Sequence, residues 1–145
     1  MTLDAVLAIG HHLAVFGILG VLVAEAVLVR PGVDPAAVQR VGRIDSAYGM
    51  LAAAVLAVGG ARVAWGAKPA SFYLENPVFW AKMNGFLVIG LLSIWPTIRF
   101  IRWRRREDAP PEGEVRTVQR LVHLQLGLFF ALPALAALMA RGIGH

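Results

Sequence analysis

Four basic or imidazole side chains interrupt otherwise apolar stretches of this 145-residue sequence: His11, His12, Arg62 and Lys82. A charge at the centre of a membrane helix costs about 2.5–3.5 kcal/mol on insertion scales, so a charged residue inside such a stretch needs an explanation. Lysine and arginine bind carboxylate groups well, and Asp4 is the only acid that we expect at the same depth. This excess of positive charge predicts an anionic ligand, such as a carboxylate or a propionate.

Arg62 and Lys82 also have a simpler interpretation. Both lie near the ends of their apolar segments, where a long side chain can extend to the polar surface of the bilayer. Aromatic residues of the kind that gather at membrane interfaces flank them: Trp65, Tyr73, Phe79 and Trp80. The sequence leaves both interpretations open, a partner inside the protein and a position at the interface.

A second set of polar residues combines acids with bases: Glu25, Arg43, Asp45, Tyr48, Arg120 and His123. Charged groups inside a membrane pair with one another or mark the pathway of an ion or proton. Because this set contains both signs of charge, we interpret it as a buried polar network that holds the helices together. The alternative is a relay for protons or ions that uses Glu25, Asp45, His123 and His11.

The histidines are the candidate ligands for a metal or cofactor. Haem iron accepts an axial histidine, so His11 is the candidate metal ligand, with Arg62 and Lys82 available to the haem propionates. His12 points about 100° away from His11, and His123 is expected roughly 10 Å deeper, which makes a simple bis-histidine site strained. The chain has no cysteine and no H-E-x-x-H motif, so zinc hydrolysis has no support.

The elements that must position these residues are membrane helices. Hydrophobic residues make up 58% of the chain and the mean hydropathy is +0.66, which is typical of helical membrane proteins. Segments of roughly 20 apolar residues span a bilayer, and four such segments occur at about residues 3–29, 46–65, 78–100 and 118–140. Asn76 can cap the third helix, with Pro77 at its first position. We expect an all-α, integral membrane four-helix bundle that forms a single domain over residues 1–145.

Residue spacing predicts which helix faces point inward. Asp4, His11 and Glu25 are separated by seven or fourteen residues, which is close to a whole number of helical turns, so they share one face of the first helix. Tyr48 and Arg62 share a face of the second helix for the same reason. Polar stripes of this kind are expected to face the interior of a bundle.

Basic residues predict the orientation of the chain. Ten arginines lie in or beside the connections between the first and second segments and between the third and fourth: Arg30, Arg40, Arg43, Arg99, Arg102, Arg104, Arg105, Arg106, Arg116 and Arg120. The positive-inside rule places both connections in the cytoplasm and both termini outside. These arginines are also expected to contact anionic lipids. Topology therefore explains the isoelectric point near 10.7, and nucleic acid is not an expected partner.

Several motifs carry a resemblance to a known family. The runs GHHLAVF, RIDSAYG, FYLENPVFWAKMNGF, GLLSIWPTIRFIRW and ALPALAALMARGIG resemble the bacterial membrane protein family DUF2214 over nearly the whole chain. A histidine early in the first helix and a lysine early in the third are also similar to HemJ-type protoporphyrinogen oxidases, and the general plan is similar to CopD-like membrane proteins. This resemblance implies that His11 and Lys82 serve a porphyrin, and that the chain is a multi-pass protein of the bacterial inner membrane.

Three functions follow as hypotheses. The first is a protein that binds haem b or another porphyrin and acts in redox chemistry or porphyrin metabolism. The second is a small ion or proton transporter, for which four helices would need to form a homo-oligomer. The third is an accessory membrane subunit without catalysis, in which every polar group is structural. Whether the chain is an enzyme stays open at this point.

Overall fold

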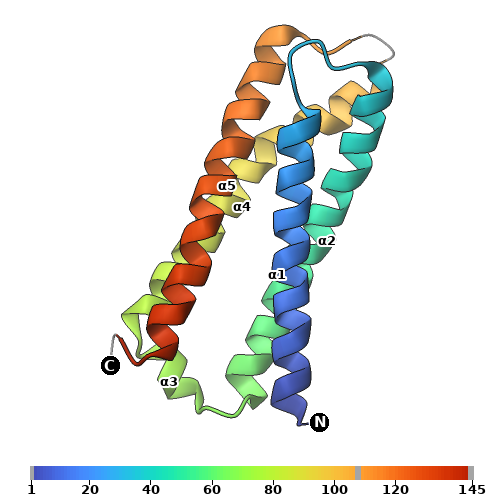
Figure 1. Cartoon of the computed structure of the whole chain (residues 1–145). Helices are drawn as coiled ribbons and strands as arrows, with labels where there is room; N and C mark the ends of the chain where they lie inside the picture. The colour runs from blue at the N-terminus through green and yellow to red at the C-terminus, as the bar shows by residue number, and fades with distance from the viewer. Residues whose placement is uncertain (1, 107–108, 144–145) are drawn as a thin grey trace.

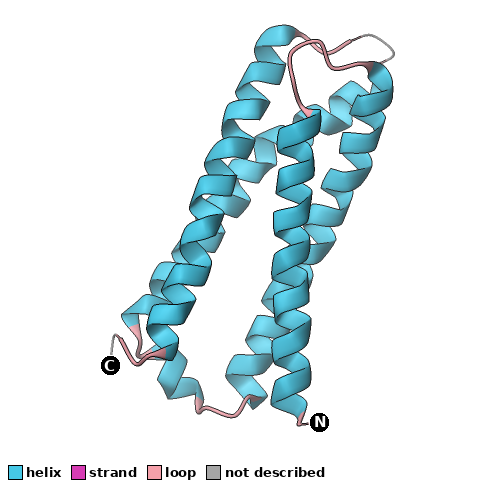
Figure 2. Ribbon diagram, viewed as in Figure 1, coloured by secondary structure: helices cyan, strands magenta, loops and turns pink. Residues whose placement is uncertain are grey.

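The computed structural model describes residues 2–106 and 109–143. In this part of the chain, the elements are α1 (Leu3–Leu28), α2 (Pro35–Trp65), α3 (Ala70–Leu74), α4 (Pro77–Arg105) and α5 (Glu112–Ala140). The long helices α1, α2, α4 and α5 form an elongated bundle, and the short helix α3 connects α2 to α4 (Figures 1 and 2). Each long helix is long and apolar enough to cross a membrane, which confirms the predicted all-α, four-span architecture.

Local sequence signals set where the helices begin. The Asp34 carboxylate accepts a hydrogen bond of 2.7 Å from the Ala37 amide at the start of α2. The Asn76 side chain accepts one of 2.8 Å from the Val78 amide at the start of α4, and Pro77 is the first helical residue. These side chains satisfy amide groups that the first turn of a helix leaves unpaired. The predicted cap at Asn76 is confirmed.

Three helices are longer than the predicted spans, at the end of the bundle that holds the arginine-rich connections. α2 begins at Pro35 instead of residue 46, α4 continues to Arg105, and α5 begins at Glu112. The predictions followed the apolar residues alone, whereas a helix continues through polar residues until a cap or a proline ends it. We call this end of the bundle the arginine end.

The opposite end, which we call the terminal end, holds both chain termini and α3 (Figure 1). A chain with four antiparallel spans must return to the side where it began, so the shared location of the termini follows from the number of spans. The sense of this arrangement relative to the cytoplasm stays a prediction from the arginines.

The helices pack as two close pairs, α1 with α2 and α4 with α5, and the contacts between the pairs are fewer. The buried core lies mainly toward the arginine end, where Leu22 and Val122 are completely enclosed. Between the level of Val55 and the terminal end, Asn76 and Met139 are the buried side chains of the described residues. The pairs diverge toward the terminal end (Figure 1), so this half of the bundle is less tightly packed.

Large apolar side chains cover the outer surfaces of the helices. Phe16, Leu87, Ile94 and Phe130 are each more than half exposed, and they belong to α1, α4 and α5. A soluble protein rarely exposes this much contiguous apolar surface. Contact with the hydrocarbon of a lipid bilayer explains these outward faces.

Candidate functional site

Three of the predicted site residues come together in the terminal half of the bundle. His11 of α1 lies close enough to Arg62 of α2 and Lys82 of α4 for their charges to interact, and Arg62 and Lys82 also interact with each other. All three side chains are partly buried. We call His11, Arg62 and Lys82 the basic cluster. It joins one helix pair to the other where the pairs begin to diverge.

The His11 ring is held against α2 by a close approach of the two helices. A Cβ atom added at Gly59 would lie 3.3 Å from His11 Cε1, so a side chain at this position would press on the ring. The imidazole also interacts with the backbone of Val55. His11 Nδ1 and Arg62 Nε are both buried and neither has a hydrogen-bond partner. The basic cluster therefore has unused hydrogen-bonding capacity.

Among the residues that the structure describes, no acid forms an ion pair with the basic cluster. Asp4 lies on the same face of α1, but its Oδ1 accepts a hydrogen bond of 3.2 Å from the Ala67 amide and makes no ion pair with Arg62 or Lys82. The ion pairs of the described residues are Arg99–Glu114 and Arg116–Glu112, both at the arginine end. Two cationic side chains and a histidine thus converge without a counter-charge from the described part of the chain.

The other two histidines do not join the cluster. His12 Nδ1 lies 2.7 Å from the Ala8 carbonyl oxygen of its own helix, and His123 Nδ1 lies 2.7 Å from the Gln119 carbonyl oxygen. Both side chains are exposed. The expected cofactor-binding group of five residues is thereby reduced to His11, Arg62 and Lys82. A bis-histidine site has no support from this arrangement.

The chemistry of the cluster suits a carboxylate better than a bare metal ion. Among the described residues, no group of three or more His, Cys, Asp or Glu side chains is placed to hold a metal. His11 would be the single protein ligand of any metal at this position. Lys82 and Arg62 supply charge-assisted hydrogen bonds, for which a carboxylate is the matching partner.

A second group of polar residues lies buried toward the arginine end. Glu25 is 2% exposed, Asp45 7%, Tyr48 6% and Gln125 1%. The Tyr48 hydroxyl donates a hydrogen bond of 3.2 Å to Gln125 Oε1, which links α2 to α5. The carboxyl groups of Glu25 and Asp45 interact with each other and link α1 to α2. We call Glu25, Asp45, Tyr48 and Gln125 the acidic cluster.

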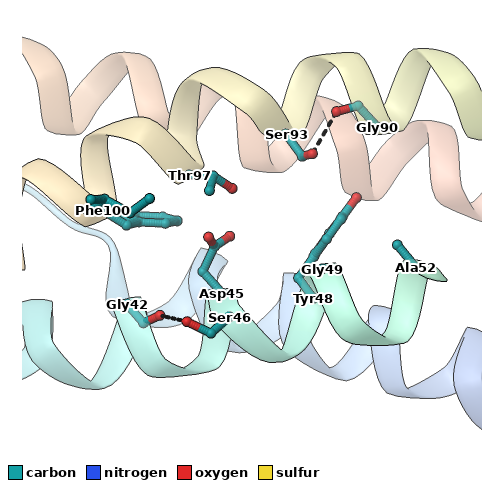
Figure 3. Close-up of a pocket in the computed structure, with 11 residues that line it drawn as sticks. Gly42, Asp45, Ser46, Tyr48, Gly49, Ala52, Gly90, Ser93, Thr97 and Phe100 are labelled. Atoms are coloured by element: carbon teal, nitrogen blue, oxygen red, sulfur yellow. Dashed lines mark hydrogen bonds between the residues drawn. The ribbon is translucent and has the colours of Figure 1, made fainter. Parts of the chain in front are cut away.

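A half-open cavity of about 270 Å³ borders the acidic cluster between α2 and α4. Its lining includes Asp45 and Tyr48 of α2 and Ser93 and Thr97 of α4. Figure 3 shows the Asp45 carboxyl and the Tyr48 hydroxyl pointing across the space between the helices, toward the α4 side chains. Ser93 Oγ donates to the Gly90 carbonyl oxygen at 2.6 Å. Side-chain oxygen atoms thus lie on both sides of a cavity whose lining is otherwise mostly apolar.

Two arginines that the sequence analysis placed in this network do not belong to it. Arg43 and Arg120 are exposed. Asp45 is buried and lies two residues from Arg43, which places the two side chains about 200° apart on the helix. Arg120 lies midway between the buried residues Val118 and Val122 and therefore faces outward. The acids of the cluster consequently lack the basic partners that were expected for them.

Gln125 and Thr97 are members of the polar interior that the sequence analysis did not include. Gln125 continues the buried series Val118, Val122 and Phe129 at spacings of three and four residues. This spacing is the pattern of an inward-facing helix stripe, so it was an available signal for a buried glutamine. Thr97 carries no comparable signal, because an isolated threonine in an apolar helix is equally compatible with packing.

A third polar unit closes the arginine end. Glu114 of α5 accepts hydrogen bonds from Arg99 Nη1 at 3.1 Å and from the buried Trp103 Nε1 at 2.8 Å. The Arg99 guanidinium also lies over the Trp95 ring, 4.5 Å from its centroid. This unit connects α4 to α5 and explains why α5 begins well before its apolar stretch.

Comparison with known proteins gives one finding, a match to a protein family. The family described as predicted membrane protein (DUF2214) matches residues 3–144. The chain belongs to this family. No match was found among curated proteins or among solved structures. Membership of DUF2214 agrees with the four apolar helices, and its description names no activity, substrate or cofactor.

Proposed function

We propose that this DUF2214 protein binds haem or a related porphyrin, with the carboxylates of the ligand at the basic cluster. The observation that supports the proposal is the convergence of His11, Arg62 and Lys82, from three helices, without an acidic partner among the described residues. This arrangement favours a ligand with carboxylate groups. The choice of a porphyrin comes from the resemblance of His11 and Lys82 to residues of the HemJ-type proteins.

The residues of the basic cluster have different roles in the proposed binding. Arg62 and Lys82 would hold the propionates by charge-assisted hydrogen bonds, and the less tightly packed terminal half of the bundle offers apolar surface to the ligand. His11, whose Nδ1 has no hydrogen-bond partner, would be the ligand to iron. Bound haem would supply one-electron redox chemistry to the protein.

The test is a titration of the purified, full-length protein in detergent with haem and, separately, with metal-free protoporphyrin. Lys82→Met removes one charge-assisted hydrogen bond, worth about 1.5–3 kcal/mol, so we expect both ligands to bind roughly tenfold to a hundredfold more weakly. His11→Ala removes the iron ligand, so we expect it to weaken haem and shift its Soret band, with a smaller effect on protoporphyrin.

The chain provides matched controls for both substitutions. His12→Ala removes a neighbouring imidazole that is exposed and bonded to its own helix. Lys68→Met removes an exposed lysine at the same end, whose Nζ lies 3.7 Å from the Phe72 ring centroid. Both controls should bind the two ligands like the unmodified protein. A protein that stays colourless through the titration, or equal effects of His11→Ala and His12→Ala on haem, would overturn the proposal.

A further inference from the structure

We infer that the Glu25–Asp45 carboxyl pair is a binding site for one small hard cation, a proton or Na⁺, which reaches the pair through the cavity between α2 and α4. This site lies toward the arginine end and is separate from the basic cluster. The inference does not depend on porphyrin binding. It assigns a ligand to residues whose types and spacing predict a structural network or, as the alternative, a relay for protons or ions.

The first reason is the lack of a counter-charge. The carboxyl groups of Glu25 and Asp45 lie close enough to interact, and both side chains are more than nine-tenths buried. Arg99, on the neighbouring helix α4, is engaged by Glu114, while Arg43 of α2 is exposed. The remaining groups that face the pair, Tyr48, Thr97 and Gln125, are uncharged. Two adjacent carboxylates inside a membrane repel each other, so a bound cation is needed to hold the pair there.

Basic side chains of α5 do not supply that charge either. Arg120 and His123 are exposed, and His123 Nδ1 is bonded to the Gln119 carbonyl oxygen. At the arginine end, Arg104 lies against Gly42 on the exposed surface and pairs with Gln39. Each of these basic side chains is therefore exposed or engaged by another partner.

The second reason is an unused ligand atom. Glu25 is 2% exposed, and its Oε1 has no hydrogen-bond partner although it is enclosed. Buried polar atoms in native proteins almost always have a partner, so an orphaned carboxyl oxygen beside a second carboxyl indicates a position for a proton or an ion. The nearby groups offer oxygen atoms, which are the ligands that hard cations prefer.

The third reason is access. Asp45 forms part of the wall of the half-open cavity of about 270 Å³, whereas Glu25 lies behind it in the closed interior. Figure 3 shows Asp45, Tyr48, Ser93 and Thr97 around this space. A cation that enters the cavity meets Asp45 first and Glu25 second. The geometry thus combines an entrance with an enclosed acceptor.

The test uses infrared difference spectroscopy on the full-length protein in phosphatidylcholine vesicles. Stepping the pH at constant ionic strength without Na⁺ should change the carbonyl-stretch band of a protonated carboxyl, and Glu25→Gln and Asp45→Asn should each remove that change. Adding Na⁺ at fixed pH distinguishes the occupants. If Na⁺ abolishes the band and releases a proton, Na⁺ occupies the site. If the band responds to pH but not to Na⁺, a proton occupies the site.

Matched controls separate loss of the site from loss of the fold. Asp34→Asn is the same substitution on the same helix, and asparagine also serves as an N-cap, so its spectrum should match that of the unmodified protein. Circular dichroism on every variant checks that the helices are retained. A carboxyl band that responds neither to pH nor to Na⁺ in the folded, unmodified protein would refute the inference, as would a response that persists in both Glu25→Gln and Asp45→Asn.

Discussion

Glu112 and Glu114 offer a direct comparison between a surface ion pair and a partly buried one. Both lie in the first turn of α5, so replacing either with alanine removes the same charge from the positive end of the helix. Glu112 pairs with Arg116, and both side chains are about three-fifths exposed. Glu114 pairs with Arg99 at side-chain exposures of 28% and 21%, and it also accepts the indole hydrogen bond of Trp103.

The expected costs differ because the groups left behind differ. Glu112→Ala breaks an exposed pair between residues i and i+4, which is worth about 0.3–0.5 kcal/mol. Glu114→Ala leaves the Trp103 indole N–H buried without a partner, at a cost of about 1–3 kcal/mol, and it also leaves Arg99 unpaired. Glu114→Ala should therefore lower the free energy of unfolding by about 1–2 kcal/mol more than Glu112→Ala does.

The assay is reversible unfolding of each variant in mixed detergent micelles, followed by circular dichroism as the denaturing detergent increases. A double-mutant cycle of Glu114→Ala with Arg99→Ala should give a coupling energy above about 0.5 kcal/mol. The reasoning is refuted if Glu112→Ala and Glu114→Ala destabilise the protein equally, within about 0.5 kcal/mol. That result would mean that α5 is held to α4 by apolar packing and that the polar unit adds nothing measurable.

Three further predictions concern topology and packing. Because the chain has no cysteine, Lys68→Cys and Arg105→Cys provide single labelling sites at opposite ends of the bundle. In intact cells an impermeant maleimide should label the Lys68→Cys variant. Labelling of the Arg105→Cys variant alone would show that the orientation is the reverse of the predicted one. Tyr48→Phe removes the hydrogen bond to Gln125 and should lower the free energy of unfolding by about 0.6 kcal/mol, and by at most about 1.7 kcal/mol, in the same assay. A loss above about 3 kcal/mol would contradict the role of a single interhelical hydrogen bond. Gly17→Val should destabilise the α1–α2 pair by about 1–3 kcal/mol, because a Cβ added at this position would lie 3.0 Å from a methyl group of Leu51 on α2. An unfolding midpoint equal to that of the unmodified protein would show that the leucine side chain moves aside without cost.

The sequence was a good guide wherever the controlling interaction is local. Asn76 and Pro77 predicted the start of α4, because capping involves atoms of adjacent residues. The spacing of His11 and Glu25 predicted a shared face of α1, and both side chains contact residues of neighbouring helices in the structure. The start of α2 was placed too late, although Asp34 and Pro35 carried the same type of signal as Asn76 and Pro77.

Only part of the composition of the polar interior could be predicted from the sequence. The sequence was sufficient to exclude Arg43 from the polar interior, because a helix cannot direct both Arg43 and Asp45 inward when they are two residues apart. By contrast, the meeting of Tyr48 with Gln125 depends on how α2 and α5 are rotated toward each other. Spacing within one helix gives no information about that rotation.

Hydropathy thus determined the four helices that can span a membrane and the even number of crossings, and helical periodicity indicated the shared face of His11 and Glu25 on α1. These properties follow from the bilayer, which requires every backbone polar group to be satisfied within its own helix. Tertiary structure decided which inward residues meet. It brought His11, Arg62 and Lys82 together without an acid, and it left Glu25 and Asp45 together without a base. The physical reason is that pairing between helices depends on side-chain packing across their interfaces, which joins residues far apart in the chain.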